Sequence, residues 1–353
     1  MRSHADAVGD DIVLVDMMNL AFRMTFAHQH LSAGGKPTGA TFGVLKTVRD
    51  LRENVSKRIV FCWDHGVPVL GAPKPRNWRD GMMNGYKAER KPNDAYADLI
   101  PQLAPLHRML SLLGYSHASV MGLEADDIIG VLSKSAWPNT VKMILSTDKD
   151  FYQLFDEEWV RVIVPKKDKG EFQYVHQSDV EREYGIGVSR WAEYLALGGD
   201  KSDSIKPMKG MGPKTAIKLI QSGVDLRKPL ELQTKEFKTK YGSVWARVQN
   251  CYSAARVPTS LSDPRIESCM TADNNNSLVP LPDQRWATPD IKARAMREFT
   301  SFLADNGMLS LLADAKSFFD TENRPKCTQT PTGCLPQRPR GQNIPMRPRA
   351  RLL

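Results

Sequence analysis

Short apolar runs that each end at a carboxylate recur through the first part of the chain. An apolar run of about four to eight residues between polar segments predicts a buried strand. Strands of an α/β sheet deliver the residues at their carboxyl ends into a common crevice. Acids that follow successive strands, or that open the next helix, are therefore expected to meet in space. These acids are Asp16, Asp64, Glu124, Asp126, Asp127, Asp148, Asp150, Asp200 and Asp203.

A cluster of this many carboxylates requires cations. Two carboxylates about 4 Å apart repel by roughly 4 kcal/mol at an effective dielectric constant near 20. Several such pairs would exceed a typical folding stability of about 5–15 kcal/mol. Bound divalent metal removes the conflict, and ligands that are all oxygen atoms favour Mg²⁺ or Mn²⁺. The segments GLEADD, STDKD and GDKSD supply enough oxygens for two hydrated cations, as in two-metal phosphodiester hydrolysis. Taken alone, Asp126 and Asp127 have an ordinary alternative, because acids are common in the first turn of a helix.

The charge of the chain predicts a polyanionic partner. Its 353 residues carry a net charge of +9 although the acids above are concentrated in one expected site. A basic surface around an acidic metal pocket suits a substrate rich in phosphate. The five cysteines form no C-x-x-C pair, which fits a reducing cytoplasm. No apolar stretch approaches the roughly 20 residues of a membrane span, so we expect a cytoplasmic protein with no membrane partner.

Hydrophobic periodicity predicts an α/β fold with a mainly parallel central sheet flanked by helices. Alternating strands and helices fill the first half of the chain, and helices alone follow from about residue 178. The predicted strands are 12–15, 59–63, 115–120, 141–145 and 160–164. The predicted helices are 44–55, 99–113, 178–184, 188–197, 213–221 and a segment around Ile291 and Phe302. Pro105 is expected to kink the second helix or to delay its start.

A glycine-containing turn precedes the predicted helix 213–221. Gly210 and Gly212 allow backbone amides to approach an anion closely, and the helix directs its N-terminus to the same place. Lys209 and Lys214 flank the turn. The expected ligand is a phosphate group of a duplex DNA backbone. The alternative is a simple turn between two packed helices.

The segment 79–90 is long, polar and basic, which is unusual for a structural loop. Our interpretation is a clamp over the acidic pocket, in which Lys87 and Arg90 compensate phosphate charge. Tyr86 would offer a face for base stacking. A solvated charged surface is the alternative.

Six segments in the same order resemble the 5′-nuclease, or flap endonuclease, family. They are VDMMNLAFR, FCWDHG, GYKAER, GLEADDIIG, STDKDFYQL and GDKSDSIKPMKGMGPKTA. This family includes the N-terminal nuclease domain of bacterial DNA polymerase I and phage 5′-exonucleases, and the similarity covers roughly residues 10 to 225. The resemblance implies a PIN-like nuclease fold with a helical arch. It also implies a helix-hairpin-helix that holds duplex DNA, with a bound K⁺ ion in some members.

The resemblance also implies roles for individual residues. Asp16, Asp64, Glu124 and Asp126 would form a first metal site, with Asp148 close enough to contribute. Asp150, Asp200 and Asp203 would form a second, with Asp127 as an outer ligand. Arg79, Lys87 and Arg90 resemble arch residues that steer the scissile phosphate. The expected DNA contacts are Tyr86, Lys209, Gly210, Gly212, Lys214 and Thr215.

These features together predict a Mg²⁺-dependent 5′-3′ exonuclease or flap endonuclease. It would act as a monomer on DNA 5′ ends, flaps or nicks, and on RNA–DNA hybrids where RNA primers are removed, in a bacterial or phage-infected cell. Retention of the second acidic set favours hydrolysis over a DNA-binding relative without activity, which is one alternative. A PIN-type ribonuclease is another, and the expected hairpin near Gly210 argues against it.

The sequence predicts four parts of the chain. Residues 10–177 would be the nuclease core, with the arch near 71–110, and residues 178–257 the helical DNA-binding region. Residues 258–320 would be a linker followed by C-terminal helices. Residues 321–353 are rich in Pro and Arg and are expected to be a disordered basic tail.

Overall fold

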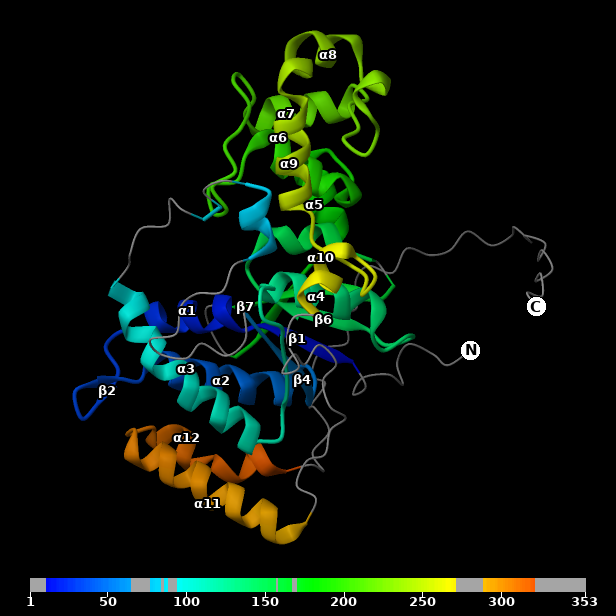
Figure 1. Cartoon of the computed structure of the whole chain (residues 1–353). Helices are drawn as coiled ribbons and strands as arrows, with labels where there is room; N and C mark the ends of the chain where they lie inside the picture. Colours follow the sequence, from blue (N-terminus) through cyan, green and yellow to red (C-terminus); the bar gives the residue numbers. More distant parts are fainter. Residues whose placement is uncertain are drawn as a thin grey trace, which may run out of the picture.

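A six-stranded sheet with the order β5-β4-β1-β6-β7-β8 forms the centre of the computed structural model (Figure 1). The structure describes residues 11–64, 77–83, 86–87, 94–156, 158–166, 170–270 and 288–320. The strands are β1 (Ile12–Asp16), β4 (Arg58–Trp63), β5 (Ser116–Ser119), β6 (Lys142–Leu145), β7 (Val160–Pro165) and β8 (Phe172–Val175). A separate small hairpin joins β2 (Ser32–Ala33) and β3 (Lys36–Pro37).

The sheet is parallel except for β8, which runs antiparallel to β7. The predicted α/β class with a mainly parallel sheet is therefore confirmed, whereas β8 was not predicted. From β1 the chain moves to β4 and β5 on one side and then returns to β6 on the other. Strand order reverses beside β1, and ligands of open α/β sheets bind at the carboxyl ends of strands at such a point.

Alternating side chains of β1 feed two hydrophobic cores. Val13 and Val15 face one core, and Ile12 and Leu14 face the other, because successive residues of a strand point to opposite sides. The first core is covered by α1 (Met17–Ala27), α2 (Gly39–Asn54) and α3 (Asp94–Leu112), and the second by α4 (Ala125–Ser135). Both faces of the strand are buried, which explains its uninterrupted apolar sequence.

The helix α3 runs through Pro101 and Pro105 without ending. The helix begins at Asp94, so the expectation that Pro105 delays its start is wrong. Both prolines are exposed, so the carbonyl groups that lose a helical partner can bond to water. Leu103, Leu106 and Leu110 are fully buried and hold the helix against the sheet. Tertiary packing here outweighs the local preference.

A helical region extends from the carboxyl edge of the sheet (Figure 1). Its elements are α5 (Gln177–Tyr184), η4 (Val188–Arg190), α6 (Trp191–Gly198), α7 (Pro213–Gln221), η5 (Leu230–Leu232), α8 (Lys235–Tyr241), η6 (Gly242–Val244) and α9 (Trp245–Ala255). They share a core of their own around Trp191 and Phe237. The observed α7 has the predicted bounds.

The last described helices return to the body of the protein. α10 (Pro264–Met270) lies beside α4, within the stretch expected as a linker. α11 (Pro289–Asp305), α12 (Leu309–Ala313) and η7 (Ala315–Phe319) add Phe299 and Phe318 to the core beneath α2 and α3. Within the described ranges, no helix is both long and apolar enough to cross a membrane. Within the expected arch near 71–110, residues 71–76, 84–85 and 88–93 lie outside the described residues, and so does the whole expected basic tail.

Candidate metal centre

Three acids stand where β1, β4 and β6 end. Asp16 is the last residue of β1 and caps α1, with Oδ1 accepting from the Asn19 amide at 3.1 Å. Its Oδ2 accepts from Ser146 Oγ at 3.0 Å, just beyond β6. Asp64 follows β4 and accepts from the Ala125 amide at 2.8 Å. Asp148 begins η3 (Lys149–Leu154). The parallel sheet therefore brings together acids from distant parts of the sequence.

Mutual repulsion acts on this group. Burial, followed by the charges of Asp64 and Asp148, raises the pKa of Asp16 to about 7. The hydrogen bonds from Asn19 and Ser146 act in the opposite direction but do not offset these effects. A carboxyl group that resists ionisation because of neighbouring carboxylates is stabilised in its charged form by a cation.

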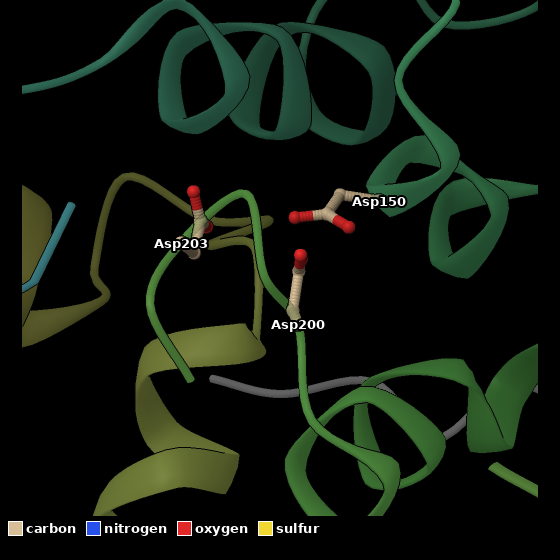
Figure 2. A group of neighbouring side chains, drawn as sticks. All are labelled: Asp150, Asp200 and Asp203. Atoms are coloured by element: carbon tan, nitrogen blue, oxygen red, sulfur yellow. The ribbon is translucent and has the colours of Figure 1, made fainter. Parts of the chain in front are cut away.

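A second group of acids gathers next to the first. One carboxylate oxygen from each of Asp150, Asp200 and Asp203 lies within 4.8 Å of the others. Figure 2 shows the three side chains entering one space, Asp150 from η3 and the other two from the loop after α6. Reciprocal backbone hydrogen bonds between Asp200 and Ile205, at 2.8 and 2.7 Å, close that loop. Burial raises the pKa of Asp150 well above its usual value, and Asp148, Asp203 and Asp200 add to the shift.

The acids of α4 have unequal environments. Asp127 is fully buried, and its Oδ2 accepts from the Glu124 amide at 3.0 Å, which forms a capping box at the start of the helix. Asp126 is more exposed, with 18% of its side chain accessible, and its charge contributes to the raised pKa of Asp150. The Asp127 carboxylate also accepts from Trp78 and Arg79, and its expected role as an outer ligand stays a prediction. The alternative of an ordinary helix-start acid describes Asp127 well.

Arg79 is buried beneath these acids rather than directed to an external phosphate. It lies in the short helix η2 (Trp78–Gly81) and is only 1% exposed. Its guanidinium donates to Asp127 at 3.0 Å, to Asp126 at 3.0 Å and to the Ala254 carbonyl at 3.1 Å. The Nε, Nη1 and Nη2 atoms of Arg79 each donate to an oxygen of the protein. This buried position contradicts the expected role of steering a scissile phosphate.

The side chains of Tyr86 and Lys87 both contact Glu124 and Asp203. The Tyr86 hydroxyl donates to Glu124 Oε2 at 2.8 Å and lies 3.1 Å from Asp203 Oδ2. The ring is 7% exposed, which contradicts the expected open face for base stacking. Lys87 Nζ lies 2.7 Å from Glu124 Oε1 and 3.7 Å from Asp203 Oδ1. Burial alone would raise the pKa of Glu124, but Lys87 and Arg79 bring it down to about 2. Arg90 lies outside the described residues.

The glycine turn before α7 is open on its outer side. Gly210 has a φ of +74°, and a β-carbon placed at Gly210 or Gly212 would meet no atom within 4 Å. Gly212 instead has extended backbone with a φ of −115° and caps α7. Met208 and Met211 are buried and anchor the turn. Lys209 and Lys214 are exposed beside it, and Thr215 is half-buried in the first turn of α7.

The donor set fits hard divalent cations. Every expected ligand offers carboxylate oxygen, and the two groups are electrostatically linked because Asp148 raises the pKa of both Asp16 and Asp150. Oxygen ligands of this kind suit Mg²⁺ or Mn²⁺ and do not suit a structural zinc site, which takes sulfur and nitrogen. Asp16, Asp64, Glu124 and Asp126 would hold one ion, with Asp148 close enough to contribute. Asp150, Asp200 and Asp203 would hold another.

We expect the metal-free protein to lose stability as the pH rises from about 4 to about 7. The pKa of Asp16 is about 7 in the folded state and 3.8 when unperturbed, so only the folded chain keeps this proton in that window. The corresponding contribution is present below the lower value and is lost as the pH passes the upper one. It amounts to a few kcal/mol, since one pKa unit is worth about 1.4 kcal/mol.

Thermal melts in EDTA across this range, repeated with Mg²⁺, test the expectation. Mg²⁺ should restore stability most at the high end of the range, where the carboxylates are ionised. An Asp16→Asn variant should show a flatter pH profile without metal. A melting temperature in EDTA that rises with pH would contradict the assignment.

Comparison with known proteins agrees with this geometry. Residues 11–185 match the family described as 5′-3′ exonuclease, N-terminal resolvase-like domain. DNA polymerase I of Deinococcus radiodurans is 34% identical over 224 residues, which are 63% of this chain and 22% of the polymerase. The 5′-3′ exonuclease of Buchnera aphidicola is 32% identical over 216 residues, which are 60% of this chain and 69% of the exonuclease.

The same comparison extends to solved structures. T5 5′-exonuclease with bound divalent metal ions (zinc) superposes with a TM-score of 0.56 at 15% identity, over 82% of this chain and 98% of that one. This likeness shows a common fold across the sheet and the helical region. Because the chain matches more than two thirds of an exonuclease at 32% identity, it belongs to the 5′-nuclease family.

Proposed function

We propose that this protein is a divalent-metal-dependent nuclease that hydrolyses phosphodiester bonds near DNA 5′ ends, as a 5′-3′ exonuclease and flap endonuclease that uses Mg²⁺. The observation that carries the proposal is the convergence of acids from β1, β4, α4, η3 and the α6–α7 loop at one edge of the sheet. The chain spans 22% of the length of the polymerase relative, so its activity is inferred from the nuclease part alone.

The acids would hold two cations over the reacting phosphodiester. When bound, the metal ions supply charge neutralisation and activation of water at the phosphate. Asp150 from η3 and Asp200 and Asp203 from the loop after α6 would together hold one ion, so its ligands would come from two segments of the chain. Ser146 and the Asn19 amide hold the Asp16 carboxylate in one orientation, which preorganises the other site.

Lys87 is the side chain best placed to meet the scissile phosphate. Its ammonium already lies between Glu124, at the start of α4, and the loop acid Asp203. A cation fixed there opposes the negative charge that builds on the phosphate oxygens during the reaction. We keep Arg90 as a second candidate for this role on sequence grounds.

The turn at Gly210 and Gly212 would grip the duplex away from the cleaved bond. Its open face, the exposed lysines Lys209 and Lys214 and the N-terminus of α7 support a contact to a backbone phosphate. A K⁺ ion shared between this turn and the phosphate is part of the proposal. We also propose that the protein acts as a monomer in the cytoplasm. RNA–DNA hybrids would be further substrates.

Gly212→Val should lose cleavage chiefly on substrates with duplex beside the cleaved end. The extended backbone at Gly212 accepts valine without strain, and the added side chain meets open space, so the fold should survive. The valine would obstruct the approach of a phosphate, which needs a bare backbone. Cleavage rates on a flap and on a short single strand measure the difference. Equal loss on both substrates, in a variant with wild-type circular dichroism, would mean that the turn supports the metal site and does not grip DNA.

A panel of end-labelled substrates tests the function itself. Flap, nicked duplex, single-stranded DNA and an RNA–DNA hybrid are incubated with Mg²⁺ or with EDTA. We expect short 5′ products on flap and nick with Mg²⁺ and none with EDTA. Tight binding to the flap without products in Mg²⁺ or Mn²⁺ would favour the non-hydrolytic DNA-binding alternative. Cleavage of structured RNA with intact DNA would favour the PIN-type ribonuclease.

A further inference from the structure

The segment that joins α9 to α10 lies against the metal centre although it follows the matched residues 11–185. We call residues 253–266 the α9–α10 brace. α4 approaches it so closely at Gly130 that an added β-carbon would lie 2.2 Å from the Pro258 carbonyl oxygen. Ser135 donates to the Thr259 carbonyl at 3.1 Å, and Val257 and Ile266 are buried in the same core as α4. The brace therefore fixes the helix that carries Glu124 and Asp126.

One path from the brace to the acids runs through Trp78. The guanidinium groups of Arg79 and Arg265 lie 4.3 and 4.7 Å from the centre of the Trp78 ring. The indole Nε1 of Trp78 donates to Asp127 Oδ2 at 3.0 Å. Arg79 in turn donates to Asp126. Planar guanidinium groups stack on aromatic rings in a way that an ammonium does not reproduce. Arg265 is thus connected to Asp126 and Asp127 by contacts through Trp78 and Arg79.

The end of α9 gives Arg265 a fixed position. Its guanidinium forms two bonds to Asp263, at 2.8 and 2.6 Å. It also donates to the carbonyls of Ser253 and Arg256, at 3.1 and 2.9 Å. Arg79 donates to the carbonyl of Ala254, between them. Cations are favoured at a helix C-terminus, where carbonyl groups lack partners. Both arginines are therefore held by α9 as well as by the ring.

A second path reaches Asp150 through Gln153. The Gln153 amide nitrogen donates to the Asp150 carbonyl at 2.9 Å and to the Ala255 carbonyl at 3.1 Å. Its amide oxygen accepts from the Val257 backbone at 2.9 Å. The Gln153 side chain thus connects the backbone of Asp150 in η3 to the backbone of Ala255 and Val257 at the end of α9. The two paths are independent, because they use different side chains and reach different acids.

We propose that the α9–α10 brace is a positioning element of the metal centre: Arg265, through Trp78 and Arg79, orients the α4 acids, and Gln153 orients Asp150. The inference rests on the proposed function in that these acids bind divalent cations. Groups that hold metal ligands in place typically contribute about 10- to 100-fold to metal affinity. The brace accordingly sets how tightly the cations bind, whereas the glycine turn sets the grip on duplex DNA.

Two variants and one control test the proposal on the full chain. Arg265→Lys keeps the charge but loses the planar fork, and Gln153→Met keeps the length but loses all three hydrogen bonds. Arg182→Lys is the matched control, because Arg182 is 77% exposed in its side chain and pairs with Asp179 on α5, remote from the brace. Mn²⁺ binding without DNA is followed by the loss of the free-ion electron paramagnetic resonance signal. DNA affinity is measured in EDTA, and single-turnover cleavage is measured against Mg²⁺ concentration.

We expect Arg265→Lys and Gln153→Met each to bind Mn²⁺ about tenfold more weakly, as is typical when a partner of a metal ligand is lost. Cleavage should fall at limiting Mg²⁺ and recover in part at saturating Mg²⁺, with DNA affinity in EDTA unchanged. Wild-type Mn²⁺ affinity in both variants, or an equal loss of DNA affinity, would overturn the proposal. If Arg265→Lys fails to fold, Gln153→Met decides by the same criteria. Failure of the wild-type protein to bind Mn²⁺ would instead overturn the proposed function.

Discussion

Asp150→Asn is expected to abolish cleavage and at the same time to stabilise the metal-free protein. Asp150 is nearly buried, and the charges of Asp148, Asp200 and Asp203 oppose its ionisation. Asparagine removes a ligand charge that a cation needs. Because a catalytic metal is worth several kcal/mol and each 1.36 kcal/mol is tenfold in rate, cleavage should fall by about 1,000-fold or more. Single-turnover assays in Mg²⁺ measure this loss.

The stabilisation has a definite pH dependence. The folded-state pKa of Asp150 is raised, so ionisation destabilises the wild-type fold increasingly as the pH climbs above the unfolded value. Asparagine never ionises. In EDTA, the variant should therefore melt above the wild type by a margin that widens with pH, and Mg²⁺ should raise its melting temperature less than that of the wild type. Asp305→Asn, at the end of α11, is the control and should change neither property. Retained turnover at saturating Mg²⁺ would remove Asp150 from the centre.

Lys87→Ala should reduce the chemical step far more than duplex affinity. The Lys87 ammonium lies between Glu124 and Asp203, where it would oppose the charge that grows on a scissile phosphate in the transition state. Loss of one fixed donor of this kind costs about 100- to 1,000-fold in rate. The φ of Lys87 is +54°, and alanine carries the same β-carbon, so the backbone strain is unchanged and the loss reports on the ammonium.

Single-turnover rates and binding isotherms, measured on one flap substrate, separate the two effects. Lys87→Arg keeps the charge and should recover part of the rate. Lys316→Ala, on the remote helix η7, is the control for simple loss of a positive charge. Equal losses in rate and affinity would make Lys87 an ordinary phosphate anchor.

Much of the architecture follows from local pattern in the sequence. The predicted strand 59–63 is β4 from Arg58 to Trp63, and the predicted helix 213–221 is α7. Strand length, helical periodicity and the preference for proline at a helix start act over a few residues, so they can be recognised in the sequence alone. The convergence of acids was also predictable, because a parallel sheet delivers the ends of its strands to one edge.

The role of each individual residue within a cluster could not be predicted from local pattern. Asp126 and Asp127 are neighbours in sequence and identical in chemistry, yet Asp126 stays partly exposed whereas Asp127 is fully buried and accepts from Trp78 and Arg79. Tyr86 carries no local signal that separates a stacking platform from a buried hydroxyl donor. These outcomes depend on which face of a short helix is covered, and that is decided by elements far away in the chain.

The sequence by itself thus determined the parallel strands β1, β4, β5, β6 and β7 and the acids that follow them, since these depend on local periodicity and on the geometry of parallel strands. The strand order and the antiparallel β8 came only from the fold. Only the tertiary structure decided that Arg79 supports α4, that Arg265 reaches it through Trp78, and that Gln153 ties η3 to α9. Arg79 and Ala254 are 175 residues apart, and no periodic pattern connects them. Such contacts arise because a buried charge must find partners wherever packing places them, so they become visible only when the chain is folded.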